Sequence, residues 1–372
     1  MSNATSENSR LTVDDWVSFA RSEYLTGPVA AGGSAIRFVS GSDATLAAAS
    51  SRLTQVATQC GFEAVHLDPG VRDEDGRAPN LHRIDRLFAA VTRHAEWKSW
   101  AEAEARSFLE RQTGVAIPTD VDLRDVDAVA QAAGLDANRL LQVYERELDN
   151  RIRDHRLTLE FRAALAYLFS SALRRDERSP TTDEVLLAWL KGKSLPGGAA
   201  ALKRLQIFGR IGPANARHSL ASYCHWLLRR GKSGLLVVFD FRPYIHRRIT
   251  ALERNVAVDR DLRAAASGGT GLTAAQLNAL LGRRDAAPGI AYADGPYYQM
   301  LASLRRFIDE IDRFPGLFMV VLTPPSYYAA SERGRRTFYD YDALQTRIGQ
   351  EIADTGRANP AAALVDLEGD ER

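Results

Sequence analysis

Two apolar runs place the strongest constraint on the fold of this chain. GLLVVFD, residues 234–240, and GLFMVVLT, residues 316–323, lack the alternation of polar and apolar residues that a half-exposed strand shows. Strands without this alternation are buried on both faces, as in parallel sheets that are covered by helices. We therefore predict an α/β fold in which both runs lie inside one parallel sheet.

The N-terminal part of the chain predicts the first unit of the same sheet. AIRFVS, residues 35–40, is short, rich in β-branched and aromatic residues, and followed by Gly41. Apolar residues at helical spacing predict a helix over 44–60, and FEAVHLD predicts a second strand over 62–68. A strand, a helix and a strand within about 30 residues form a βαβ unit, whose strands are parallel. We expect 35–40 to share a sheet with the two buried runs, and helix 44–60 to pack on one face of it.

Helical periodicity dominates the middle of the chain, while the outer segments alternate between helix and strand. The middle helices are predicted at 81–112, 125–133, 137–154, 157–174, 182–191 and 214–230, separated by glycine and proline. Elsewhere, helices are predicted at 12–24, 274–281, 295–313 and 340–353, and a last strand at 363–368. We divide the chain into a disordered tail (1–10), a first part of an α/β core (11–79), a helical insertion (80–230) and a second part of the core (231–372).

Composition argues against several classes of protein. No apolar run in the 372 residues approaches the roughly 20 residues of a membrane helix, and the N-terminal segment lacks the apolar core of a secretory signal. Cys60 and Cys224 are the only cysteines, and the seven histidines show no HxxxH or HxH spacing, so neither a disulfide nor a metal site is expected. The 48 basic and 47 acidic residues nearly cancel, which gives no compositional signal for nucleic-acid binding. We expect a cytoplasmic protein without a membrane segment.

The turn after the first predicted strand is a candidate nucleotide-binding site. A phosphate-binding loop follows a buried strand and opens a helix with the pattern GxxxxGK[ST]. Its backbone N–H groups, lysine and hydroxyl hold the phosphates and Mg²⁺. GSDATLAA, residues 41–48, occupies this place in the chain. The candidate nucleotide-binding residues of the turn are Gly41, Ser42, Asp43 and Thr45.

The same frame departs from the phosphate-binding pattern at three positions. Leu46 stands at the second glycine, Ala47 at the lysine and Ala48 at the serine or threonine. A leucine places a side chain where the backbone must approach the phosphate, and the missing lysine removes a charge-assisted contact worth about 1.5–3 kcal/mol. Gly41 in a strand-to-helix turn is also explained by a structural role alone. The turn therefore predicts a degenerate loop, without the residues that grip ATP.

Two further candidates end the buried runs. Asp240 stands where a Walker B aspartate would hold Mg²⁺ at the carboxyl edge of a parallel sheet, and Thr323 where P-loop ATPases carry a polar sensor. Phe241 replaces the catalytic glutamate that follows a Walker B aspartate, so no residue is predicted to be catalytic. A loop-ordering role for Asp240 and a strand-end role for Thr323 explain the same residues. Because the lysine and hydroxyl partners are absent, we favour the structural role for Asp240.

Basic residues concentrate between Arg229 and Arg263. Such a run is usually a solvated face of the protein. The alternative is contact with DNA or phosphate, for which the candidates are Arg242, Arg247 and Arg248. Two GKS triplets, residues 192–194 and 231–233, lack the earlier glycine of a phosphate-binding loop and are predicted to be helix ends.

Four segments, taken in order, resemble the P-loop ATPases of the BREX phage-defence systems, over nearly the whole chain from Gly32. GGSAIRFVSG resembles that family's entry to the Walker A loop, and GFEAVHLDP its second strand. LLRRGKSGLLVVFD resembles its Walker B helix and strand. The most distinctive segment is LFMVVLTPPSYYAASERGRRTFYDYDALQTRI, residues 317–348, where the positions in step with the family are Phe338, Tyr341, Ala343, Leu344 and Arg347.

The resemblance implies a P-loop NTPase-like fold of AAA/STAND type: a parallel sheet flanked by helices, with a largely helical insertion. It also implies ATP and Mg²⁺ as the ligands of the family, and a place in bacterial antiviral defence. Because Leu46, Ala47, Ala48 and Phe241 replace motif residues of the family, we expect no cofactor for this chain. We expect instead a pseudo-ATPase that binds other defence proteins, with a catalytic ATPase paralogue as a candidate partner. The alternatives are a working ATPase with an atypical Walker A loop and a nucleic-acid-binding accessory protein.

Overall fold

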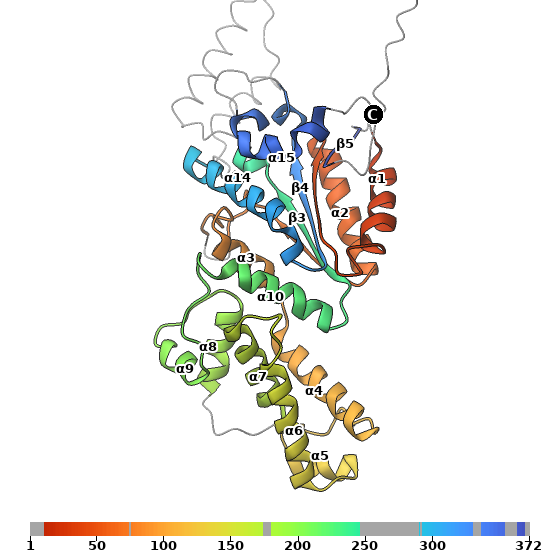
Figure 1. Cartoon of the computed structure of the whole chain (residues 1–372), viewed down its shortest axis with the longest axis vertical. Helices are drawn as coiled ribbons and strands as arrows, with labels where there is room; N and C mark the ends of the chain where they lie inside the picture. Colours follow the sequence, from red (N-terminus) through yellow and green to blue (C-terminus); the bar gives the residue numbers. More distant parts are fainter. Residues whose placement is uncertain are drawn as a thin grey trace, which may run out of the picture.

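The core of the protein is a five-stranded sheet in which every pair of neighbouring strands is parallel (Figure 1). The computed structural model describes residues 11–73, 76–173, 180–245, 290, 292–329, 336–353 and 363–368. The strands are β1 (Ala35–Ser40), β2 (Phe62–Leu67), β3 (Gly234–Asp240), β4 (Leu317–Thr323) and β5 (Leu364–Asp366), and their order is β2-β3-β4-β1-β5. The predicted α/β class is confirmed. The prediction that 35–40, 234–240 and 316–323 lie in one parallel sheet is confirmed as well.

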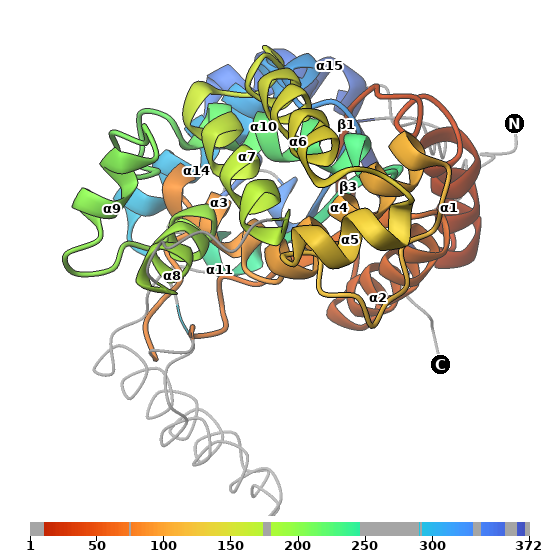
Figure 2. The ribbon, with the colours of Figure 1, turned by 90° about the horizontal axis from the view of Figure 1, so that it is seen from below.

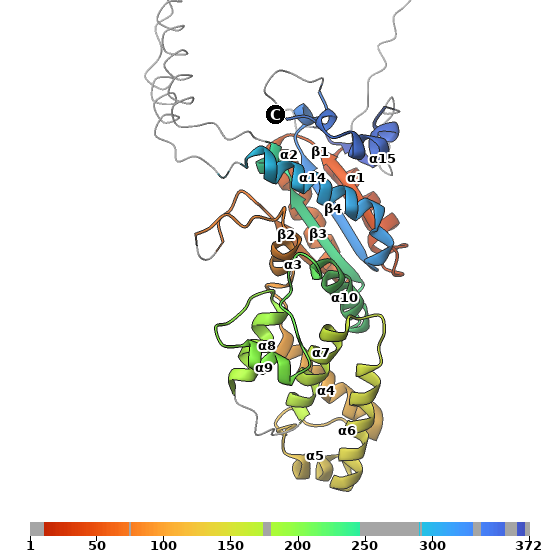
Figure 3. The same cartoon turned by 60° about the vertical axis from the view of Figure 1, so that its left-hand side comes forward.

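Strands β3 and β4 are buried along their whole length because helices cover both faces of the sheet. Leu236 and Val238 of β3 enter one hydrophobic core, whereas Leu235 and Val237 enter the other, as the period of two in a strand requires. The first face is covered by α1 (Val13–Ala20) and α2 (Asp43–Gln59), as predicted for helix 44–60. The second face is covered by α3 (Ile84–Thr92), α10 (Ala216–Arg229) and α14 (Asp294–Asp309) (Figures 1 and 3).

Between β2 and β3 the chain forms helices and no strand wherever the structure describes it. Besides α3 and α10, these helices are α4 (Trp97–Thr113), α5 (Val126–Ala133), α6 (Ala137–Ile152), α7 (Leu159–Leu173), α8 (Pro180–Leu190) and α9 (Ala199–Arg204). We call α4–α9 the helical lobe. It lies beyond the amino ends of the strands (Figures 1 and 2), so it is remote from the edge where parallel α/β sheets bind ligands.

The prediction of one long helix over 81–112 is wrong, because the structure has two helices there. Helix α3 ends at Thr92, and α4 begins at Trp97 after a turn. The turn lets Trp97 and Trp100 pack on Trp226 of α10. Their ring centroids lie 4.4 and 5.2 Å from the centroid of the Trp226 ring. The four residues of the turn include no glycine or proline, so only the tertiary packing reveals the break.

Other predicted elements differ at their ends. The helix predicted over 12–24 is α1 followed by a π-helix at Arg21–Leu25, and the helix over 295–313 is α14 followed by a 3₁₀ turn at Ile311–Arg313. The helix over 340–353 is α15 (Asp342–Ala353), and the last strand is β5, shorter than 363–368. The tail 1–10 and the helix over 274–281 lie outside the described residues.

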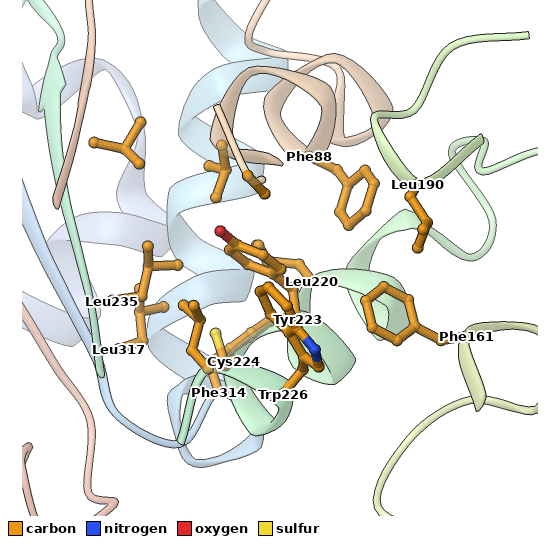
Figure 4. Packing of buried hydrophobic residues seen from close by; sticks show 14 of the residues in the cluster. Phe88, Phe161, Leu190, Leu220, Tyr223, Cys224, Trp226, Leu235, Phe314 and Leu317 are labelled. Carbon is orange, nitrogen blue, oxygen red and sulfur yellow. The ribbon is translucent and has the colours of Figure 1, made fainter. Parts of the chain in front are cut away.

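Helix α10 joins the sheet to the helical lobe. Figure 4 shows Tyr223 and Cys224 of α10 between Leu235 and Leu317 of the sheet on one side and Phe161 of α7 on the other. All five side chains belong to one buried cluster. The hydrophobic core on this face of the sheet therefore continues into the lobe without a break.

Gly234 at the start of β3 leaves no space for a side chain. A Cβ atom there would overlap the carbonyl oxygen of Gly316 and lie 2.5 Å from Cε1 of Phe62, the partner of Gly234 in β2. We expect Gly234→Ala to lower the free energy of unfolding by about 3 kcal/mol, because two strands would have to move apart. Urea denaturation measures this change. The control is Gly295→Ala in α14, which has open space around it and should leave the stability unchanged or slightly raised; equal midpoints for the two variants would contradict the expected close packing.

Candidate functional site

Two of the residues predicted to form a site, Asp240 and Thr323, lie at one edge of the sheet, where Ser40 joins them. Ser40, Asp240 and Thr323 end β1, β3 and β4, and Ser40 is directly opposite Thr323 in the register. We call this the carboxyl edge. The chain leaves β1 toward α2 on one face but leaves β3 and β4 toward helices on the other face. Such a divergence between neighbouring parallel strands is where α/β sheets bind ligands.

The turn after β1 is too short to be a phosphate-binding loop. Only Gly41 and Ser42 separate β1 from α2, which begins at Asp43. Ser42 is the N-cap, and its Oγ accepts a hydrogen bond of 3.2 Å from the backbone N–H of Thr45. The Thr45 hydroxyl lies 2.7 Å from Ser42 Oγ and 3.3 Å from the carbonyl oxygen of Glu368. The polar groups of this turn are therefore used to start a helix.

The segment aligned with the glycine, lysine and serine of a Walker A loop lies inside α2. Leu46 is fully buried in the core under α2, and its N–H donates to the carbonyl oxygen of Ser42. Ala47 is exposed on the helix surface. In a phosphate-binding loop these positions open the helix, and their backbone N–H groups are free to point at the anion, whereas the N–H of Leu46 is already bonded inside α2. The second half of the frame supplies no such donors.

Arg242 occupies the place in which a metal or phosphate would meet Asp240. The Asp240 carboxylate is buried, and Arg242 donates to it from Nη2 at 2.6 Å, from Nε at 2.9 Å and from the backbone N–H at 3.0 Å. Arg242 Nη1 also donates to Asp43 at the start of α2, at 2.5 Å. The hydrogen bonds to Asp240 are the main reason why the pKa of Arg242 is raised. The guanidinium therefore bridges the two carboxylates as a permanent internal cation.

The other residues of the carboxyl edge also face inward. The Thr323 hydroxyl is fully buried, 3.2 Å from the carbonyl oxygen of Val39 and 3.1 Å from the Tyr328 hydroxyl. Burial raises the pKa of Tyr328, which keeps that hydroxyl neutral. Phe241 is fully buried and stacks on Tyr244, with ring centroids 5.8 Å apart. Its position belongs to the core and leaves no room for a group that activates water.

ATP with Mg²⁺ does not fit this arrangement. Mg²⁺ needs oxygen ligands that are free of a competing cation, and the Asp240 oxygens already accept three N–H groups of Arg242. Among the residues that the structure describes, no cluster of three or more His, Cys, Asp or Glu side chains could hold a metal ion. The chemistry of the carboxyl edge is structural: the Asp43–Arg242–Asp240 bridge holds the start of α2 to the end of β3.

The position of the carboxyl edge follows from the strand ends in the sequence, but its main interaction does not. Arg242 is a candidate contact under the nucleic-acid alternative, yet its side chain is only 21% exposed and lies between two carboxylates. The signal that could have found the pair is the two-residue spacing of Asp240 and Arg242 after a strand. Arg247 and Arg248 lie outside the described residues. Both GKS triplets follow a helix, and Gly192 and Gly231 have the positive φ angles of helix ends, as predicted.

Comparisons of the chain with protein-family models, with curated proteins and with solved structures give no match. In the part of the chain that the structure describes, no helix has both the length and the apolar character to cross a membrane.

The bridge at the carboxyl edge predicts unequal effects of its three residues. Arg242→Ala should lower the free energy of unfolding by about 3 kcal/mol, because it leaves the charge of the buried Asp240 carboxylate without a compensating cation. Asp43→Ala should change stability little, because the Asp43 side chain is 90% exposed. The double variant Asp240→Asn/Arg242→Ala should recover part of the loss. Urea denaturation distinguishes these cases, and an Arg242→Ala protein as stable as the wild type would mean that Asp240 does not depend on the bridge.

Proposed function

We propose that this chain is a non-catalytic relative of the P-loop ATPases, which acts by binding other proteins of a bacterial anti-phage defence system. The observation that carries the proposal is the Asp43–Arg242–Asp240 bridge. It places an arginine on the one carboxylate that would hold Mg²⁺, in a chain that also lacks the lysine and the hydroxyl of a Walker A loop.

The arrangement of the strands supports a P-loop NTPase-like fold of AAA/STAND type. β1 lies in the interior of an all-parallel sheet, between β4 and β5, and is followed directly by α2. The Walker B position, Asp240, ends the strand two places away. These are compatible places for the two motifs of such a fold, and they are the places that the degenerate segments occupy.

The assignment to phage defence rests on the four segments that resemble the ATPases of BREX systems. We expect the protein to work in the cytoplasm and to bind other proteins of the system, with a catalytic ATPase paralogue as the first candidate. In this proposal the protein contributes binding surfaces to the system and does not hydrolyse ATP. The helical lobe is the largest part of the described chain outside the sheet and the helices that cover it, and it is the part that we expect to meet partners.

No observation at the carboxyl edge favours the working ATPase as a second function. ATP binding would require Arg242 to leave a buried carboxylate, which costs about 3–5 kcal/mol when the partner is lost. It would also require the first turn of α2 to unwind, which would break its N-cap hydrogen bond. Both costs would have to come from the binding energy of the nucleotide, without a lysine to contribute to it.

The central expectation is that the isolated protein neither binds ATP with micromolar affinity nor hydrolyses it. Calorimetric titration with ATP and Mg²⁺ should give no saturable heat, and a phosphate-release assay should give no signal above the buffer. Arg242→Ala, which frees Asp240, should not create hydrolysis, because Phe241 cannot orient the attacking water. Micromolar binding, or turnover that Asp240→Ala abolishes, would instead establish the working ATPase.

The interaction part of the proposal has its own test. The chain is co-expressed with the products of the genes that flank its own gene, and complexes are separated by size-exclusion chromatography. We expect a stable complex with at least one flanking defence protein. Flanking genes without any defence function would remove the basis of this assignment, whatever the ATP titration shows.

A further inference from the structure

A basic hollow lies where α3 and the loop before it meet the end of α8. Its volume is about 420 Å³. Six of the residues that line it are arginine or lysine and two are aspartate, an excess of four positive charges in a chain whose net charge is only +1. We define the basic hollow by Arg86, Arg93, Lys193 and Arg210.

Three arginines in the basic hollow have no carboxylate partner among the residues that the structure describes. Arg86 and Arg93 are seven residues apart on α3 and its C-cap, so both lie on one face of the helix, two turns from each other. Arg210 comes from the connection between α9 and α10. Arg83, at the rim, differs from them because it pairs with Asp85 at 2.9 Å. Converging unpaired cations repel one another, so an anion placed between them is stabilised.

The basic hollow forms where small residues let the end of α8 approach α3 closely. Gly192 ends α8 with φ of +67°, and a Cβ atom there would lie 2.9 Å from the Cβ of Ala89 on α3. This close approach of the backbone to α3 places Lys193 and Ser194 on the wall opposite Arg86 and Arg93. The GKS triplet that is a helix end thus also contributes to a charged surface.

A second, smaller hollow of about 150 Å³ adjoins the first and shares Lys193, Ser194 and Arg210 with it. The rest of its lining is mostly apolar and includes Trp189 and Phe208. The Trp189 side chain is buried and fixed by a hydrogen bond of 2.8 Å to the carbonyl oxygen of Gly209. Phe208, in contrast, is 70% exposed, beside the cations that both hollows share. Phe208 thus presents an exposed aromatic face beside Arg210, one of the three arginines without a carboxylate partner among the described residues.

We propose that these two adjoining hollows form a binding site for single-stranded nucleic acid. Phosphodiesters lie in the basic hollow against Arg86, Arg93 and Arg210, and a base stacks on Phe208. Cationic grooves with aromatic platforms are how proteins bind single strands without sequence preference. A duplex does not expose the face of a base to Phe208, and a small ligand would need a more enclosed and more apolar site than exposed arginines provide. The proposal does not depend on the pseudo-ATPase assignment.

The test uses the full chain and a fluorescein-labelled oligothymidylate of on the order of 10 nucleotides. Fluorescence anisotropy is measured over a range of salt concentrations. We expect an affinity that falls steeply with salt. Arg86→Ala/Arg93→Ala should weaken binding and make the slope of log K against log salt shallower by about 1.4, which corresponds to two lost phosphate contacts on a single strand. The matched control is Arg139→Ala/Arg146→Ala, which removes two exposed arginines at the same spacing from α6 and should leave affinity and slope unchanged.

Phe208 gives a second and independent measurement. Phe208→Ala should weaken binding about fivefold or more without changing the salt slope, whereas Phe208→Tyr, which can still stack, should bind like the wild type. A labelled duplex of the same length should bind more weakly and should not respond to Phe208→Ala. The proposal is overturned if the oligonucleotide does not bind at low salt, or if the two arginine pairs have equal effects. It is also overturned if Phe208→Ala leaves the affinity unchanged, because the contact would then lie elsewhere on the chain.

Discussion

Burial of β3 and β4 on both faces is the constraint on which the rest of the structure depends. Every backbone N–H and C=O group of these strands must find a partner within the sheet, and each side chain must enter one of two cores. The sheet therefore needs helices on both faces, and these come from segments far apart in the sequence. The only parts of β3 and β4 that can carry polar groups are their ends, which is why Asp240 and Thr323 stand there.

The same constraint explains the chemistry of the carboxyl edge. A carboxylate at the end of a buried strand must be compensated, either by a ligand such as Mg²⁺ or by a side chain of the protein. In this chain Arg242 provides the compensation from the next turn, and Asp43 extends it to α2. Because Arg242 already compensates the charge of Asp240, the carboxyl edge does not attract a cation electrostatically. The buried carboxylate of Asp240 and the internal cation of Arg242 thus depend on each other.

The strands could be predicted from the sequence, because burial on both faces leaves a pattern in a few adjacent residues. The break between α3 and α4 could not, because it depends on the packing of Trp97 and Trp100 against Trp226, more than a hundred residues later. The place of the site was predictable from the strand ends. The interactions within the site could not be predicted. Ser42 fits equally well as a loop residue and as an N-cap, and Asp43, the partner of Arg242 at the start of α2, is 199 residues away. The basic hollow left no signal either, because its walls come from three separate segments that only tertiary contact unites.

The continuous core through α10 has a consequence for how the molecule opens. Tyr223 and Trp226 are packed by the sheet on one side and by the lobe on the other, so neither part can expose its interior without exposing that of the other. Amide protons of α7 and of β3 should therefore share one opening reaction, and a pulling force applied to the lobe would be carried straight to the central strand. A protein built in this way transmits a load as one body, and whatever holds the lobe also holds the sheet.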